Sequence, residues 1–190
     1  MILSDREIKE YITNGKLKID NMEDPHIQIQ PSGVDLRLGN DFRMFKVISV
    51  PYIDPKHPIE NYTELIKIED DEPFILHPGE FVLASVKEHI SMPLDLVGII
   101  DGRSSLGRLG IAVHTTSAGV NPGWEGTLTL EVANIGKMPV ALYAGMRVAK
   151  ITFAKLTSEP EVPYGKRGNE KYQGQDSLDE SKIFKDFKWK

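Results

Sequence analysis

The sequence has 190 residues, of which 40% are hydrophobic and 27% charged, with no cysteine and a formal net charge of −5 at pH 7. This length is sufficient for one compact domain with a hydrophobic core, and the negative charge disfavours a nucleic-acid polymer as the main partner. The lack of cysteine excludes disulfides and thiolate metal sites and is typical of a cytoplasmic protein. The sequence has neither a long apolar run nor a signal peptide, so we expect no membrane association.

The first residues predict a short helix. Ser4 and Glu7 have the spacing of a capping box, in which the serine side chain and the glutamate side chain each satisfy the other residue's backbone amide. Leu3 and Ile8 have the spacing of the flanking hydrophobic staple, and Gly15 is a suitable residue to end the helix.

Four later stretches have the composition of β-strands. They are rich in Val, Ile, Leu, Phe and Thr, alternate in part between apolar and polar residues, and are interrupted by Gly, Pro, Asn or Asp. The stretches are residues 32–45, 73–86, 126–136 and 140–156. The sequence therefore predicts a mainly β domain over residues 1–156, a barrel or double-sheet jelly roll with a short N-terminal helix.

Residues 102–110, GRSSLGRLG, combine arginine, serine and glycine without an acidic residue. Arginine forks bind phosphate oxygens, serine hydroxyls and turn amides add donors, and glycine lets the backbone approach a ligand. Arg103 and Arg108 could equally pair with surface carboxylates while the glycines shape turns. The residues alone leave both interpretations open.

Residues 121–124, Asn-Pro-Gly-Trp, predict a tight turn, and the residues after it alternate as in a strand. The alternation places Leu128, Leu130 and Val132 on one face, and Thr127, Thr129, Glu131 and Ala133 on the other. Glu131 is thus a carboxylate in the middle of a strand. Either it is exposed, or it lines a pocket in which desolvation adapts it to proton transfer.

Residues 157–190 are polar, charged and almost free of aliphatic side chains. Composition alone favours a disordered tail. A group of aromatic and hydrogen-bonding side chains within it suits a flap that becomes ordered over an anionic ligand instead; its members are Tyr164, Lys166, Arg167, Lys171, Tyr172, Gln173 and Gln175.

The sequence does not contain the common motifs of metal, hydrolase or P-loop chemistry. The five histidines form no H-x-x-x-H pair, and neither G-x-S-x-G nor G-x-x-x-x-G-K-[ST] occurs. The sequence therefore does not support a zinc ion held by the protein.

Several blocks in this order resemble the dCTP deaminase family, which belongs with the trimeric dUTPases. They are residues 1–8, 29–42, 102–110, 121–134, 143–156 and 164–175. The resemblance implies a distorted β-barrel of the dUTPase type, a homotrimer with active sites between subunits, and hydrolysis of dCTP to dUTP and ammonia without a catalytic metal. Zinc-dependent nucleobase deaminases need H-x-E and P-C-x-x-C signatures, which this chain does not contain.

The resemblance also implies roles for individual residues. Glu131 matches the acid/base that takes a proton from the water attacking C4 of cytosine and delivers protons to N3 and the departing amine. Ser104 and the Ser117 carbonyl match the groups that hold this water, and Arg108 matches an arginine beside the reacting base. The implied substrate-binding residues are Arg103, Ser104, Ser105, Gly107, Arg108, Ser117, Asn121, Trp124, Thr129, Leu130, Tyr164, Lys171 and Gln175. Mg²⁺ is expected to be bound through the triphosphate rather than by protein side chains, and dTTP is implied as an inhibitor.

Three positions depart from the family pattern. Asn121 stands where members usually carry aspartate. In the related dUTPases this aspartate belongs to a D-x-x-Y-x-G pattern and activates the water that cuts the phosphate chain. The amide of asparagine cannot act as that base. Ser117 replaces a common alanine, which is harmless if only its carbonyl acts. Gly119 and the segment 171–175, KYQGQ, resemble bifunctional members that continue to dUMP.

The main expectation is accordingly a dCTP deaminase that releases dUTP. The alternative is a bifunctional dCTP deaminase and dUTP diphosphatase that forms dUMP, which Asn121 argues against and Gly119 supports. A pure dUTPase would leave Glu131 without a role. A non-catalytic nucleotide-binding β module is the alternative from another class.

Overall fold

The structure, a computed structural model, describes residues 1–46, 50–59, 61–114 and 116–187. Its strands are β1 (Lys18–Asp20), β2 (Ile29–Gln30), β3 (Gly33–Phe45), β4 (Thr63–Lys67), β5 (Phe74–Leu76), β6 (Phe81–Ser91), β7 (Leu96–Gly102), β8 (Ile111–Val113), β9 (Gly119–Val120), β10 (Glu125–Asn134), β11 (Val140–Leu142) and β12 (Arg147–Lys155). Its helices are α1 (Asp5–Thr13), α2 (Pro25–Gln28), α3 (Ser104–Gly107) and the 3₁₀ turn η1 (Ile183–Phe187). The predicted mainly β fold with a short N-terminal helix is confirmed.

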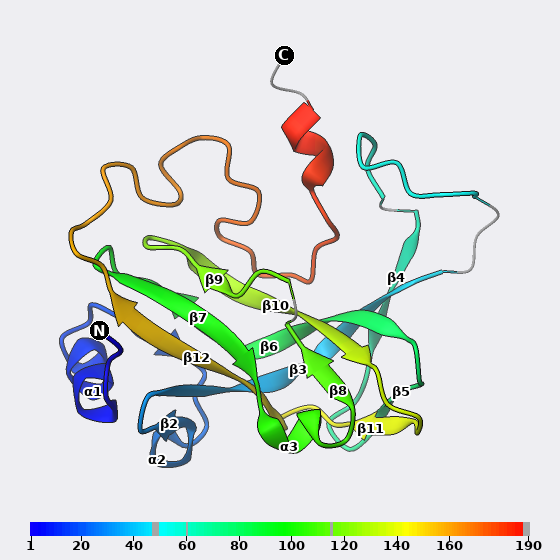
Figure 1. The fold of residues 1–190 in the computed structure, drawn as a ribbon, viewed down its shortest axis with the longest axis horizontal. Coiled ribbons are helices and arrows are strands. Elements are labelled where there is room, and N and C mark those ends of the chain that lie inside the picture. Colours follow the sequence, from blue (N-terminus) through cyan, green and yellow to red (C-terminus); the bar gives the residue numbers. More distant parts are fainter. Residues whose placement is uncertain (47–49, 60, 115, 188–190) are drawn as a thin grey trace.

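Most strands belong to one curled sheet in the order β8-β10-β6-β3-β12-β7-β9 (Figure 1). The long strand β3 joins its two halves, because residues 34–37 pair with β12 whereas residues 38–44 pair with β6. β1, β2 and β4 add to β6 and β3, and β5 pairs with β11 in a separate two-stranded sheet. All of these pairings are antiparallel, so each strand can bury one face and leave the other for water or a ligand.

The hydrophobic core lies inside the curl of the sheet and is built from alternate strand residues. Phe42 of β3 and Phe74 of β5 are stacked in it, with ring centroids 4.2 Å apart and planes 5° apart. Such offset aromatic pairs stabilise a core beyond the area that they bury. None of the helices in the described part of the chain combines the length and apolarity needed to cross a bilayer.

Helix α1 has the predicted capping box. The Ser4 amide donates to Glu7 Oε2 at 3.0 Å, and the Glu7 amide donates to Ser4 Oγ at 3.5 Å. Leu3 and Ile8 are both buried, as the staple requires, and Gly15 follows the C-cap with φ of +67°, which favours glycine. The sequence therefore predicted both ends of this helix.

A buried polar cluster, which the sequence analysis did not predict, connects β3, β6 and α2. The Glu88 carboxylate is fully buried, and it accepts hydrogen bonds from the Arg37 amide at 2.9 Å, from Arg37 Nε at 2.8 Å and from Gln28 Nε2 at 2.9 Å. The cluster lies beside the register shift between Leu38 and Phe42, where the β3–β6 ladder is interrupted. These bonds satisfy a charge that would otherwise be very costly to bury.

A short hydrogen bond between helix α1 and the turn before β7 generates a stability prediction. The Tyr11 hydroxyl donates to Asp95 Oδ2 at 2.6 Å, and burial together with this bond raises the pKa of Tyr11 to about 12. We expect Tyr11→Phe to lower the free energy of unfolding by about 1 kcal/mol at pH 7. The native state keeps the hydroxyl proton more tightly than the unfolded chain does, so this contribution is complete below pH 10 and is lost as the pH rises toward 12.

Urea unfolding of the wild type and Tyr11→Phe at a series of pH values from 7 to about 11 would measure the difference in free energy of unfolding. We expect the gap between the two proteins to narrow above pH 10, the ordinary pKa of tyrosine. A gap that is constant over the whole series would contradict this assignment.

Candidate functional site

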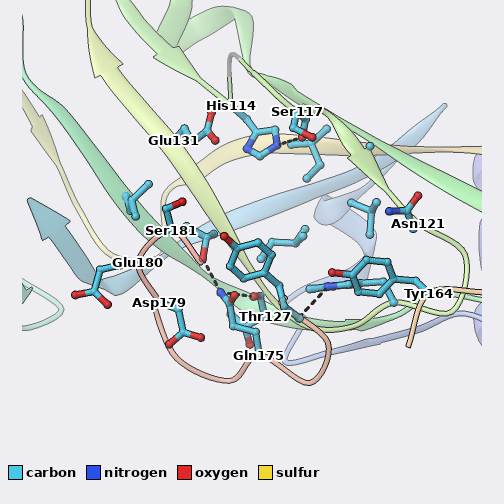
Figure 2. A pocket seen from close by; sticks show the side chains of 18 residues that line it. His114, Ser117, Asn121, Thr127, Glu131, Tyr164, Gln175, Asp179, Glu180 and Ser181 are labelled. Carbon is cyan, nitrogen blue, oxygen red and sulfur yellow. Dashed lines mark hydrogen bonds between the residues drawn. The ribbon is translucent and has the colours of Figure 1, made fainter. Parts of the chain in front are cut away.

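A cavity of about 370 Å³ lies between the sheet and the C-terminal segment (Figure 2). It is lined by strand β10 with the turn before it, by His114 and residues within the segment 117–120, by Leu83 of β6 and Ile100 of β7, and by the tail from Tyr164 onward. Figure 2 shows Glu131, His114 and Ser117 together on one side and the tail residues Gln175, Asp179, Glu180 and Ser181 on the other. The cavity is therefore closed on one side by the segment that composition alone would leave disordered.

Strand β10 places Glu131 at this cavity because its other face is in the core. Leu128, Leu130 and Val132 are 8%, 0% and 2% exposed, so the intervening residues must point to the opposite side. Glu131 is half-buried there, and the Thr116 hydroxyl donates to its Oε2 at 2.5 Å. Of the two interpretations of Glu131, the position in a cavity is the one that the structure supports, while its catalytic role stays a prediction.

His114 connects the strand of Glu131 to the Ser117 carbonyl. Its amide donates to the Glu131 carbonyl at 2.7 Å, and its Nε2 donates to the Ser117 carbonyl oxygen at 2.5 Å. The backbone at His114 has φ of +56°, which is uncommon for a residue with a side chain. This turn brings the Ser117 carbonyl, a predicted water ligand, to the same side of the cavity as Glu131.

The turn before β10 has the predicted form. The Trp124 amide donates to the Asn121 carbonyl at 3.1 Å, and Gly123 has φ of +82°, as such a turn requires. The Trp124 indole is buried, and its Nε1 donates to the Tyr172 carbonyl at 3.2 Å. Asn121 and Trp124 both line the cavity.

The tail docks on β10 through both backbone and side chain. The Thr127 amide donates to the Gln175 carbonyl at 2.7 Å, and the Gly174 amide donates to the Glu125 carbonyl at 2.9 Å. Gln175 Nε2 donates to Thr129 Oγ1 at 2.6 Å. Three predicted residues, Thr129, Tyr164 and Gln175, thus line the cavity, whereas the Leu130 side chain is fully buried and only its backbone is available to a ligand.

The tail also brings acidic side chains to the cavity, and each is paired within the chain. Burial acts to raise the pKa of Asp179, but hydrogen bonds from Lys182, at 2.6 Å, and Ser177 hold that pKa below its ordinary value. Glu180 pairs with Arg43 at 2.7 Å. Within the described residues, no group of three or more histidine, aspartate or glutamate side chains is placed to hold a metal ion.

Besides Leu130, six predicted ligand residues do not line this cavity: Arg103, Ser104, Ser105, Gly107, Arg108 and Lys171. The first five belong to helix α3 and its flanks, between β7 and β8, at the bottom of the view in Figure 1, whereas the tail runs along the top. Ser104, Ser105 and Arg108 are exposed there. Within one chain, α3 therefore does not line the cavity that contains Glu131.

Two of these predicted phosphate ligands are paired with carboxylates. Arg103 Nε lies 3.3 Å from Oδ2 of the buried Asp35, which Arg147 also contacts at 3.1 Å. Lys171 Nζ lies 2.6 Å from Asp186 Oδ2. Arg103 thus pairs with a carboxylate, as the second interpretation of residues 102–110 expected, but this carboxylate, Asp35, is buried rather than on the surface.

Sequence reasoning did not identify several cavity residues. They are His114, Asp179, Glu180 and Ser181. Thr116 was likewise missed; it does not line the cavity but bonds to Glu131. None has a spacing that marks it as functional, and they reach the site only through the turn after β8 and the path of the tail. A histidine or threonine beside a recognised block is too common a feature to be selected from one sequence. Tyr172 was part of the predicted flap and does line the cavity.

Comparisons with known proteins show the family to which the chain belongs. Residues 2–156 match the protein family described as dCTP deaminase-like. A relative from Methanothermobacter thermautotrophicus, named "dCTP deaminase, dUMP-forming", is 53% identical over 189 residues, which are 98% of this chain and 95% of the relative. A relative from Haloarcula marismortui, named "dCTP deaminase", is 46% identical over 96% of this chain and 95% of the relative.

A solved structure shares the fold. The crystal structure of 2′-deoxycytidine 5′-triphosphate deaminase from Agrobacterium tumefaciens superposes with a TM-score of 0.65 at 24% identity and covers 82% of this chain. The chain spans about half, 48%, of the length of that solved chain. The likeness supports the mainly β fold described above.

Proposed function

The chain belongs to the dCTP deaminase-like family, and on that premise we propose that it hydrolyses the 4-amino group of dCTP. Water and dCTP then give the uracil nucleotide and ammonia. The observation that carries this proposal is the half-buried Glu131 carboxylate in a cavity that the tail covers. The non-catalytic alternative would leave this carboxylate without a purpose.

In the proposed reaction Glu131 moves the protons. Its carboxylate takes one proton from a water whose oxygen bonds to C4 and delivers it to N3. It then takes the remaining proton from the C4 hydroxyl and delivers it to the amine, which leaves as ammonia as the C4 carbonyl forms. The Ser117 carbonyl, held by His114, would accept a hydrogen bond from the same water, since it lies on the same side of the cavity. Thr116, bonded to Oε2 of Glu131, fixes the direction in which the carboxylate presents its other oxygen.

The site is completed, in this proposal, by α3 of another protomer in a homotrimer. Ser104, Ser105 and Arg108 are exposed and lie away from the cavity of their own chain, so they are available to a neighbour. There Ser104 would hold the water and Arg108 would stabilise the charge that develops at the tetrahedral carbon. Arg103, Ser105 and Gly107 would bind the triphosphate from the same turn.

We propose further that residues 157–190 act as a flap over the nucleotide, with Mg²⁺ entering on the triphosphate. The carboxylates of Asp179 and Glu180 are paired with Lys182 and Arg43, so phosphate oxygens and water are the more suitable ligands for the ion. Inhibition by dTTP stays a prediction of the family resemblance.

The final product is proposed to be dUMP. The relative at 53% identity is named dUMP-forming, which favours the bifunctional alternative over the main expectation that dUTP is the end product. Asn121 lines the cavity but carries an amide, so it cannot supply the base for cleavage of the phosphate chain. A water activated by another group would have to perform that step.

The experiment that tests the function is incubation of the purified protein with dCTP and Mg²⁺. We expect release of ammonia, with dUMP and pyrophosphate as the accumulating products, measured by an ammonia assay and ion-exchange chromatography. Accumulation of dUTP would support the proposed deamination but contradict the proposal that dUMP is the final product. No ammonia from dCTP would contradict the proposal as a whole.

The Glu131→Gln substitution tests the proton-transfer role. The amide keeps the size of the side chain but cannot accept the proton of the water, so we expect the rate of ammonia release to fall by about 10²–10⁴-fold with dCTP still bound. Glu125→Gln is the matched control, because Glu125 lies on the same strand, is exposed, and is not part of the cavity lining. Near-normal turnover by Glu131→Gln would exclude the mechanism.

Mixing two inactive variants tests whether the site spans protomers. Glu131→Gln and Arg108→Ala remove groups that do not line the same cavity within one chain but would meet between two chains. After the two proteins are unfolded together and refolded as mixed trimers, about a quarter of the sites would combine an intact Glu131 with an intact Arg108. Recovery of about that share of wild-type activity is expected, whereas a site contained in one chain would give none.

A further inference from the structure

The outer half of β3 and strand β4 form an extension beside the tail, here called the β3–β4 arm (residues 41–67, of which 47–49 and 60 are outside the described residues). Figure 1 shows β4 and the connection to it rising next to the C-terminal segment. The two strands pair from Asp41 with Lys67 to Phe45 with Thr63. The proposed deamination mechanism does not use this arm.

Three side chains join the arm to the tail in a closed network. Arg43 Nη1 donates to Glu180 Oε1 at 2.7 Å and to Thr63 Oγ1 at 3.1 Å. The Thr63 hydroxyl donates to the same Glu180 oxygen at 2.6 Å. Arg43 Nε also donates to the Leu178 carbonyl at 2.9 Å, so one guanidinium binds the tail at two residues.

This network is partly buried. The side chains of Arg43 and Glu180 are each 17% exposed, and Thr63 is buried. Leu178, one of the two tail residues bonded to Arg43, is also buried, although most of the tail around it is exposed. Charged hydrogen bonds in such a setting are stronger than exposed surface pairs, which contribute little.

Strand register places the network on the wall of the cavity. Arg43 of β3 pairs with Leu83 of β6, and Leu83 pairs with Glu131 of β10. Directly paired residues point to the same face, so Arg43 and Glu131 share one face two strands, or about 10 Å, apart. Leu83 lies between them in this row and lines the cavity, as Glu180 does.

We propose that Arg43 is a positioning residue that docks residues 178–180 of the tail over the cavity of its own chain. The guanidinium determines where the tail crosses the sheet. Together with Thr63 it donates hydrogen bonds to the Glu180 carboxylate, whose charge would otherwise repel a polyanionic ligand. The consequence for nucleotide binding rests on the proposed function, whereas the docking itself does not.

Limited proteolysis without nucleotide tests the docking. We expect trypsin to release tail peptides, by cleavage at Lys166, Arg167, Lys171 or Lys182, about tenfold faster in Arg43→Met than in the wild type. Lys9→Met is the matched control, since it removes a surface ion pair with Asp5 on α1 that does not contact the tail. Glu180→Gln alters the same network from the tail side and leaves the barrel strands unchanged, so its result holds even if Arg43→Met folds poorly.

Steady-state kinetics then test the effect on the ligand. We expect KM for dCTP to rise about tenfold in Arg43→Met, with a smaller change in kcat. Arg43→Lys should show a smaller rise in KM, because lysine keeps the positive charge but lacks the forked hydrogen-bond donors of the guanidinium. Tail cleavage at the wild-type rate in both Arg43→Met and Glu180→Gln would overturn the proposal. If cleavage accelerates but dCTP is not a substrate, the docking stands and the proposed function fails.

Discussion

The candidate site depends on the two-residue alternation of β10. Leu128, Leu130 and Val132 fill the core, and this packing fixes Thr129 and Glu131 on the other face. A shift of one residue in the pairing with β6 would bury the Glu131 charge and expose three apolar side chains, at a cost of several kcal/mol. The hydrophobic core thereby determines where the carboxylate lies, and the turn at His114 and the tail assemble around it.

Structural features that depend on residues a few positions apart in the chain were predictable from the sequence. Both ends of α1 follow from the capping residues Ser4 and Glu7 and from Gly15, and the turn at Asn121 follows from its Pro-Gly pair. The alternation of β10 correctly placed its two faces. Each of these inferences needs only residues within a few positions of one another, so a single sequence contains the whole signal.

Contacts between residues that are far apart in the sequence were not predictable in the same way. Arg43 meets Glu180 across 137 positions, and the buried Glu88 meets Arg37 across 51. Both contacts depend on strand register and on the path of the tail, which composition does not encode. The position of α3 away from the cavity has the same origin, because it follows from how β7 and β8 cross the curl of the sheet. The expectation of dUTP as the end product gave Asn121 more weight than Gly119 and residues 171–175. The name of a relative 53% identical over nearly the whole chain favours the other alternative.

The strand ladders are complete before the tail begins. Every ladder between the described strands lies within residues 18–155, and the tail adds a single parallel bridge between Gly126 and Gln175. Because a ribosome makes the chain from its N-terminus, every strand of the sheet is synthesised before the segment that covers the cavity. A chain that ends near residue 160 would therefore contain the whole sheet but none of the tail residues that line the cavity.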